Sequence, residues 1–150
     1  MLNKMEFISI KQLQSFAKKV SKKIKVGDSI YLYGDLGSGK TTFARFLINS
    51  IQSNNKVKKD EVLSPTFTLA QYYNIKKISI AHYDLYRIKK KKDLFNLGLF
   101  EQEDSYINII EWPELIENKN IDRIEIFLKH AKNQKLRKYY AKYFGRFKKK

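Results

Sequence analysis

Residues 29–50 read S-I-Y-L-Y-G-D-L-G-S-G-K-T-T-F-A-R-F-L-I-N-S, and this stretch decides the fold. Within it, Gly34, Gly39, Lys40 and Thr41 match the pattern G-x-x-x-x-G-K-[ST]. In this pattern the backbone N–H groups of a glycine-rich loop surround phosphates, the Lys reaches the outer phosphates, and the hydroxyl ligates magnesium. The stretch therefore predicts a phosphate-binding loop.

The sequence on either side of the loop has the secondary structure that the motif requires. Residues 29–33 are a β-branched and aromatic run typical of a strand, and residues 41–51 place apolar side chains at helical spacing. A helix that starts near Lys40 directs its unpaired N–H groups and its positive dipole end toward the loop, where phosphates would lie. The alternative is a glycine-rich turn with Lys40 simply solvated, but such a turn does not require Lys followed by Thr.

Length and composition fit one soluble domain. The chain has 150 residues and no cysteine, which excludes disulfides and thiolate metal sites. No apolar run approaches the roughly 20 residues of a membrane span, and residues 1–10 lack the apolar core of a secretory signal. We expect a single domain over residues 1–147, a basic tail at residues 148–150, and a cytoplasmic location.

The formal charge of +16 suggests a nucleic-acid partner, because clustered Lys and Arg neutralise phosphates. The excess is almost wholly Lys, however, and it is spread along the whole chain. Together with abundant Ile, Asn and Tyr, it looks like the residue usage of an A+T-rich coding sequence. We favour a solvated surface over a dedicated binding patch, so the charge favours a tRNA-related partner only weakly.

Further strands and helices are predicted along the chain. Ser9 and Gln12 have the spacing of a capping box, which predicts a first helix after Ser9. Apolar and aromatic runs predict strands at 68–74, 77–83, 106–111, 121–129 and 136–144, and a short helix at 93–97. We expect an α/β fold, a P-loop NTPase-like three-layer sandwich with a mostly parallel central sheet and antiparallel additions.

Ser64-Pro65-Thr66 predicts a rigid extended corner that presents two hydroxyls. Pro65 fixes its own φ and biases Ser64 away from helix. In nucleotide hydrolases, a Thr or Ser on such a segment can sense the γ-phosphate and its magnesium. A turn at a strand entry with capping hydroxyls is equally consistent with the spacing.

Two carboxylates stand at predicted strand ends. Asp84 follows the strand at 77–83, where α/β sheets place ligand-handling residues. His82 is a weaker candidate, since a lone His is more often a hydrogen-bonded structural residue. Glu111 ends the apolar run 106–111, typical of a buried parallel strand, and a carboxylate there suits a magnesium–phosphate site. A charged strand end that merely faces solvent is the alternative.

The last predicted strand combines aromatic and basic side chains. Tyr139, Tyr140, Tyr143 and Phe144 lie among Lys and Arg, as on a surface that stacks nucleic-acid bases. The same pattern fits a half-buried strand, which we favour. Arg137, in the same run, is a candidate contact to a nucleotide or a partner.

Several motifs, taken in order, resemble one family. They are G-D-L-G-S-G-K-T-T at 34–42, S-P-T-F-T-L at 64–69, H-Y-D-L-Y-R at 82–87, L-G-L at 97–99 and E-W-P-E at 111–114. Together they resemble the bacterial tRNA threonylcarbamoyladenosine biosynthesis ATPases of the TsaE or YjeE type. The run of lysines at 89–92 and the Lys-rich end after Glu117 depart from the family pattern.

The resemblance implies a P-loop ATPase domain that binds ATP with Mg²⁺ and hydrolyses it slowly, as a subunit of the complex that forms threonylcarbamoyladenosine beside the anticodon of tRNA. The implied partners are a threonylcarbamoyl-transferase subunit and its paired companion, with tRNA reached through the complex and no membrane. The implied hydrolytic residues are Asp84, Glu111 and Thr66, and the implied metal ligands are Thr41 and Glu111. The implied nucleotide contacts are Asp35, Gly37, Ser38, Gly39, Lys40, Thr41, Thr42 and Trp112.

Three other functions fit parts of the sequence. A small P-loop kinase of a metabolite should carry an Arg-rich lid over the phosphates, and only Arg87 lies in a recognised motif. A GTP-dependent switch needs Asn-Lys-x-Asp, whereas residues 118–121 end in Ile. A non-enzymatic, basic RNA-binding protein would keep its RNA affinity after Lys40→Ala and lose it steeply with salt.

Overall fold

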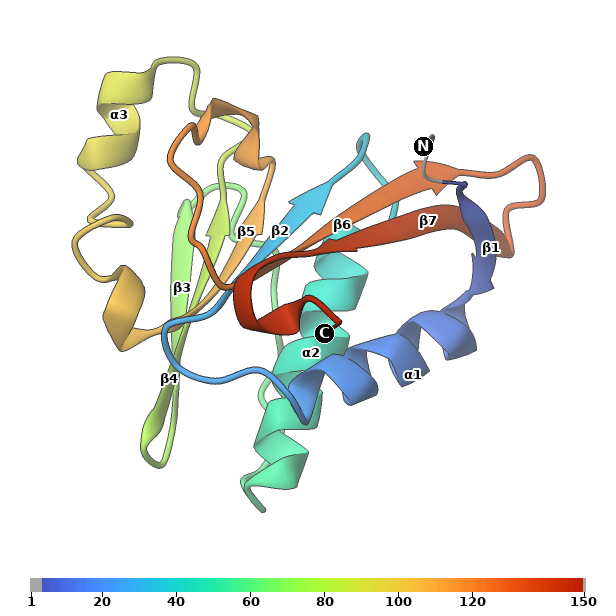
Figure 1. Cartoon of the computed structure of the whole chain (residues 1–150), viewed down its shortest axis with the longest axis horizontal. Coiled ribbons are helices and arrows are strands. Elements are labelled where there is room, and N and C mark those ends of the chain that lie inside the picture. The colour runs from blue at the N-terminus through green and yellow to red at the C-terminus, as the bar shows by residue number, and fades with distance from the viewer. Residues whose placement is uncertain (1–3, 150) are drawn as a thin grey trace.

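The computed structural model describes residues 4–149 and folds them around one seven-stranded sheet (Figure 1). The strands lie across it in the order β1-β7-β6-β2-β5-β4-β3. Their bounds are β1 Glu6–Ser9, β2 Ser29–Tyr33, β3 Ala70–Ile75, β4 Ile78–Asp84, β5 Ile107–Glu111, β6 Arg123–His130 and β7 Leu136–Tyr143. The helices are α1 Ile10–Ser21, α2 Lys40–Asn54 and the short α3 Lys91–Phe95, with 3-10 turns η1 Glu103–Ser105, η2 Pro113–Leu115 and η3 Gly145–Phe147.

The centre of the sheet is parallel. The neighbours β4, β5, β2 and β6 run in one direction. At the two sides, β3 and β7 run in the opposite direction, and β1 pairs antiparallel with β7. Strands of a parallel sheet are covered on both faces, which explains the nearly continuous apolar runs of β2 and β5. The predicted α/β fold with a mostly parallel centre and antiparallel additions is confirmed.

Helices α1 and α2 cover one face of the sheet (Figure 1). The core beneath them is mostly aliphatic and includes Leu13, Ile30, Leu32, Phe43, Leu47 and Ile126. A second, smaller cluster covers part of the opposite face and includes Tyr31, Tyr83, Leu94, Leu99 and Ile110. The predicted third layer is therefore made of α3 and irregular segments, and it lies over β2, β5 and β4 only.

Strand β1 is absent from the predictions. It pairs antiparallel with β7, and its residues Glu6 and Phe7 are both exposed, so the sequence shows no alternation there. Its pairing depends on a strand at the other end of the chain. The predicted helix start is confirmed, because Ser9 Oγ accepts from the Gln12 N–H at 3.2 Å and Gln12 Oε1 accepts from the Ser9 N–H at 2.8 Å.

Several elements begin one or two residues from their predicted starts, among them β6 at Arg123 rather than Ile121. Strand β3 starts at Ala70 rather than Thr68, because Leu69 has a positive φ of 66° and its N–H donates to the Pro65 carbonyl at 2.6 Å. This turn interrupts the extended backbone before the strand. Helix α3 starts at Lys91, earlier than predicted, inside the run of lysines.

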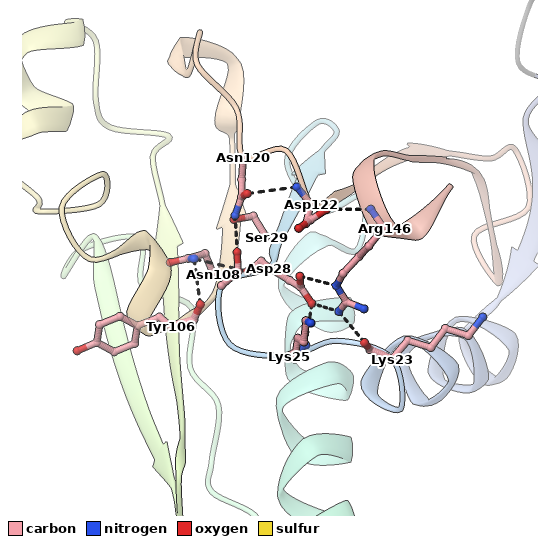
Figure 2. Close-up of polar contacts among 10 residues, drawn as sticks. Lys23, Lys25, Asp28, Ser29, Tyr106, Asn108, Asn120, Asp122 and Arg146 are labelled. Atoms are coloured by element: carbon pink, nitrogen blue, oxygen red, sulfur yellow. Dashed lines mark hydrogen bonds and ion pairs between the residues drawn. The ribbon is translucent and has the colours of Figure 1, made fainter. Parts of the chain in front are cut away.

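The C-terminal turn η3 is tied to the end of β2 that lies away from the glycine-rich loop (Figure 2). Arg146 Nε donates to Asp28 Oδ1 at 2.9 Å, and its Nη2 pairs with the other oxygen of Asp28. The same Nη2 donates to the Lys23 carbonyl at 2.7 Å, and the Arg146 N–H donates to Asp122 Oδ1 at 2.8 Å. These bonds join the C-terminal segment to the turn before β2.

The chain ends bear on two predictions. Lys150 of the predicted basic tail lies outside the described residues, as do residues 1–3, so the division into a domain at 1–147 and a tail at 148–150 stays a prediction. Within the described chain, no helix has the length and apolar character needed to cross a membrane.

Candidate functional site

The loop between β2 and α2 has a backbone that favours glycine. Gly34, Gly37 and Gly39 have φ values of 149°, 72° and 112°. A Cβ on Gly34 would lie 2.4 Å from the Leu128 carbonyl oxygen and 2.5 Å from Ser38 Oγ, so a side chain there would clash. The loop can therefore fold tightly against the start of α2, whose unpaired N–H groups favour an anion such as phosphate.

Lys40, the first residue of α2, folds its side chain back over this loop. Its Nζ donates to the Gly34 carbonyl at 2.6 Å and to the Asp35 carbonyl at 2.8 Å. Burial lowers the pKa of Lys40, while the negative charges of Glu111 and Asp84 act in the opposite direction. A desolvated ammonium group beside a loop of N–H groups favours an anionic ligand.

Glu111 connects the head of α2 to β4. Thr41 Oγ1 donates to Glu111 Oε2 at 3.0 Å, and Glu111 Oε1 lies 2.9 Å from His82 Nε2. Glu111 is 2% exposed and His82 is fully buried. Because β2, β5 and β4 are parallel, their carboxyl ends meet at one edge of the sheet, next to the loop. The carboxylate is thus fixed from two sides and aimed at the Thr41 hydroxyl.

Asp84 is opposite Glu111 in the register of β4 and β5. Its carboxylate accepts a hydrogen bond from the corner predicted at residues 64–66. Thr66 Oγ1 donates to Asp84 Oδ2 at 2.8 Å, and the Tyr86 N–H donates to Asp84 Oδ1 at 3.0 Å. Ser64 Oγ lies 2.7 Å from Thr66 Oγ1. The two hydroxyls therefore lie beside the strand-end carboxylates, and the nucleotide-sensing role of this corner stays a prediction.

Trp112, directly after Glu111, has an unusual backbone. Its φ of 57° and ψ of 56° are left-handed, a conformation that costs a non-glycine residue on the order of 1–3 kcal/mol. This conformation places the indole 4.1 Å from Lys40 Nζ and 4.8 Å from the ring of Tyr86. The indole therefore covers the ammonium group that lies over the loop.

These groups line one hollow at the carboxyl ends of the parallel strands, with a volume of ≈ 240 Å³. Its lining consists of Ile10, Leu36, Gly37, Gly39, Lys40, Thr41, Thr42, Ser64, Thr66, Asp84, Glu111, Trp112 and Arg137. A larger hollow of ≈ 670 Å³ lies between α1 and the C-terminal segment, but its lining contains no carboxylate. The chemistry of the lining, not the volume, identifies the candidate site.

Most of the predicted site residues come together in this hollow, namely Gly37, Gly39, Lys40, Thr41, Thr42, Thr66, Asp84, Glu111 and Trp112. Asp35 and Ser38 do not line it. Asp35 is exposed and contributes only its carbonyl to Lys40, and Ser38 is buried behind the loop. These two positions contribute backbone rather than side chains, and the nucleotide-binding role of the whole set stays a prediction.

Comparison with known proteins agrees with this geometry. The model of the family described as "Threonylcarbamoyl adenosine biosynthesis protein TsaE" matches residues 7–139. The chain belongs to the TsaE family. The resemblance inferred from the motifs is thereby confirmed, and the match extends beyond Glu114 into β7.

Individual relatives support the TsaE assignment. The tRNA threonylcarbamoyladenosine biosynthesis protein TsaE of Rickettsia prowazekii is 38% identical over 128 residues, which are 85% of this chain and 86% of that protein. The protein of the same name from Bacillus subtilis is 32% identical over 126 residues, 83% of this chain and 75% of its own. The crystal structure of Bacillus subtilis YdiB matches with a TM-score of 0.69 and 25% identity, covering 98% of this chain and 91% of that one.

Two further residues of this TsaE-family chain, His82 and Arg137, lie at the site. His82 was expected to be a hydrogen-bonded structural residue. It is hydrogen-bonded, and its partner is the Glu111 carboxylate of the site. His82 lies two positions before Asp84, on the same side of β4. This spacing is the sequence signal that could have placed His82 in the candidate site. Arg137, predicted to contact a nucleotide or a partner, lines the hollow from β7, and its Nη1 donates to carbonyls of Gln134 and Leu136.

The chemistry of Thr41 and Glu111 fits magnesium. Mg²⁺ takes oxygen ligands and is usually held by one or two protein groups together with substrate phosphates and water. Across residues 4–149, no group of three or more His, Asp or Glu side chains is arranged to hold a metal alone. Magnesium at this position would therefore depend on phosphate oxygens, as in a site that takes the metal together with a nucleotide.

Proposed function

We propose that this chain binds ATP with Mg²⁺ and hydrolyses it in the formation of threonylcarbamoyladenosine in tRNA. The observation that carries the proposal is the 3.0 Å hydrogen bond from the Thr41 hydroxyl to Glu111. A hydroxyl at the head of the P-loop helix and a carboxylate at a strand end are the two protein groups that hold Mg²⁺ in P-loop NTPases. TsaE-family membership and the names of the relatives supply the pathway.

The proposed binding roles follow from the positions of the side chains. Backbone N–H groups of residues 37–42 surround the phosphates, and Lys40 moves from its two carbonyl acceptors to the outer phosphates. Thr41 and Glu111 would hold Mg²⁺, which when bound neutralises charge on the β- and γ-phosphates. Trp112, in contact with Lys40, forms a wall of the nucleotide site.

The proposed hydrolytic roles rest on Asp84 and Thr66. Phosphoryl transfer to water depends mainly on positioning and charge neutralisation. Asp84 accepts from Thr66 and from the Tyr86 N–H, so it fixes the corner at 64–66 where the outer phosphate would lie. We assign Thr66 the contact to that phosphate, and Asp84 the orientation of the attacking water as a hydrogen-bond acceptor.

Slow turnover by the isolated chain follows from its arginines. An arginine at the transferring phosphate accelerates P-loop hydrolysis by about 10³–10⁵. Arg137 lines the hollow, but its Nη1 is bonded to carbonyls of its own hairpin. We propose that the partner subunits, a threonylcarbamoyl-transferase and its paired companion, supply the missing acceleration. In this scheme tRNA is reached through the complex, in the cytoplasm.

A metabolite kinase is less well supported. Such an enzyme needs arginines over the phosphates, whereas Arg45 donates to the Val62 carbonyl and Arg87 lies over the ring of Phe67. Neither residue lines the hollow.

The site assignment is tested by ATP hydrolysis in the presence of Mg²⁺. We expect Lys40→Ala and Glu111→Ala to abolish most of the activity, and Lys18→Ala, on the exposed side of α1, to leave it unchanged. Hydrolysis that survives both site substitutions would contradict the assignment.

The pathway is tested by reconstitution. The transferase subunit, its companion and tRNA are combined with and without this chain and ATP, and modified tRNA is counted per transferase. We expect the transferase to modify more than one tRNA per enzyme only when both this chain and ATP are present. Equal turnover without them would contradict the proposed function.

A further inference from the structure

Part of the sheet surface opposite α1 and α2 is accessible and plays no part in the nucleotide site. Side chains alternate along β6 and β7, so Ile126, Leu128 and Tyr139 face the core beneath the helices. Their neighbours Phe127 and Tyr140 face the other way, together with Tyr33 at the end of β2, and all three rings are half-buried. We call the surface centred on Tyr33, Phe127 and Tyr140 the open face.

The three rings form one column across three strands. Tyr33 is opposite Phe127 in register, and Phe127 is opposite Tyr140. The ring centroids are 4.5 Å and 4.4 Å apart, and both ring pairs are parallel within 6°. These distances are too short for rings that lie side by side in one plane. The rings therefore stack face to face and present their edges to solvent.

Lysines surround the column. Lys119 Nζ lies 5.2 Å from the ring centroid of Tyr33, and Lys142 Nζ lies 5.4 Å from that of Phe127. Farther out, Lys138 Nζ lies 5.6 Å from the ring of Phe7, which is 61% exposed. Aromatic edges carry partial positive charge. Ring edges and ammonium groups together make the potential of the open face positive.

Acidic side chains offset only part of this charge. Among the residues of β2, β6 and β7 that point to the open face, Glu125 is the acidic one, and it is only 4% exposed. Its carboxylate is already paired with Arg123 at 2.9 Å and Lys119 at 3.3 Å. The open face is therefore complementary to an anionic partner.

The orientation of the rings distinguishes a protein from RNA. Unpaired bases bind by stacking on exposed ring faces, but Phe127 is covered on both faces by Tyr33 and Tyr140, and Lys119 lies over Tyr33. A protein needs no exposed ring face, since protein–protein interfaces commonly combine an aromatic centre with a polar rim. Carboxylates of that protein would meet ring edges and lysines.

We propose that the open face docks an acidic surface of a partner protein, with the ring column at its centre and Lys138 and Lys142 at its rim. The inference rests on the proposed function, whose transferase subunit and companion are the proteins that would supply this surface. None of the three column residues lines the nucleotide hollow, so docking and nucleotide binding can be separated by substitution.

The test uses the full chain and the purified pair of transferase and companion. Binding is measured by titration calorimetry with ATP and Mg²⁺ present. We expect the double substitution Lys138→Glu and Lys142→Glu to weaken binding by about tenfold or more, because it places like charges opposite the acidic surface. The matched control is Lys18→Glu with Lys22→Glu, the same change of charge at an exposed position of α1 and at the exposed residue that follows its last turn. It should change binding by less than about twofold.

The outcomes separate the docking face from the function. A wild-type chain that binds the pair while both double variants bind equally well would overturn the docking face alone. A wild-type chain that does not bind the pair would contradict the proposed function and, with it, this inference. A tRNA transcript that loses affinity only for the Lys138 and Lys142 variant, with protein binding intact, would assign the face to RNA and also overturn the proposal. Unchanged ATP affinity in both variants confirms that the hollow is intact.

Discussion

At the scale of single residues, the charge of Glu111 can be separated from its shape. Glu111→Gln keeps the size of the side chain and an oxygen acceptor for Thr41, but it removes the negative charge that Mg²⁺ requires. We expect the apparent affinity for Mg²⁺ to fall by about tenfold or more. Binding of ATP without Mg²⁺ should be equal or tighter, because a negative charge beside the phosphates is gone.

Trp112, the single tryptophan of the chain, provides the signal for this measurement. Its fluorescence is followed as ATP is added with Mg²⁺ or with a chelator. Glu101→Gln, on an exposed carboxylate, is the control. An equal loss of ATP affinity with and without Mg²⁺ would show that Glu111 supports the fold of the site and not the metal.

A second residue-scale prediction concerns Tyr31, whose ring is 1% exposed. Burial raises the pKa of Tyr31 to about 12 from its ordinary value of 10.0. Above pH 10 the unfolded chain loses this proton while the folded chain keeps it, so the free energy of unfolding falls as pH rises from about 10 to about 12. Below pH 10 the stabilisation is complete.

Tyr31→Phe should remove its share of this slope, about 1.4 kcal/mol per pH unit for one proton. Chemical denaturation at several pH values from 8 to 11 measures it. The variant starts from a lower stability, because the Asn120 N–H loses its acceptor, the phenol oxygen at 3.0 Å. A slope equal to that of the wild-type chain would place the titration on other buried phenols.

At the scale of elements, the Ser9 cap fixes the start of α1 and the end of β1. Ser9→Ala removes the acceptor of the Gln12 N–H, and loss of such a cap costs about 0.5–2 kcal/mol. We expect that decrease in the free energy of unfolding, with Ser9→Asp close to wild type because its carboxylate can accept the same bond. Urea denaturation of the wild-type chain and the two variants measures these free energies. If Ser9→Ala is as stable as the wild-type chain, packing of α1 alone sets the helix start.

The same elements show what sequence can predict and what it cannot. The glycine-rich loop between a strand and a helix, the Ser9 cap and the carboxylates at strand ends were predictable, because each depends on residues within a few positions of one another. The contacts of Asp84 with Thr66 and of Glu111 with His82 depend on which strands become neighbours. Strand β1 and the ring column of the open face also depend on which strands become neighbours. The register of β1, β2, β6 and β7 joins residues far apart in the sequence, so no short stretch of sequence predicts it.

At the scale of the whole molecule, the sheet has the proposed nucleotide site at one end of β2 and a polar latch at the other. The latch is the ion pair of Arg146 with Asp28, whose carboxylate is 1% exposed and also accepts from the Lys25 N–H at 2.7 Å. Removing the partner of a buried charge is destabilising, because the remaining charge stays desolvated. The Arg146 side chain is 30% exposed, so water reduces the effect.

Arg146→Ala should therefore lower the free energy of unfolding by about 1–3 kcal/mol. Adding Asp28→Asn should recover part of the loss, because the unpaired buried charge is then gone. ATP affinity should not change in either variant, since the latch shares no residue with the hollow at the opposite end of β2. Denaturation and ATP titration of the same samples check both points. If the loss of stability in the double variant equals the sum of the two single losses, Asp28 acts through its hydrogen bonds to the turn before β2, independently of Arg146.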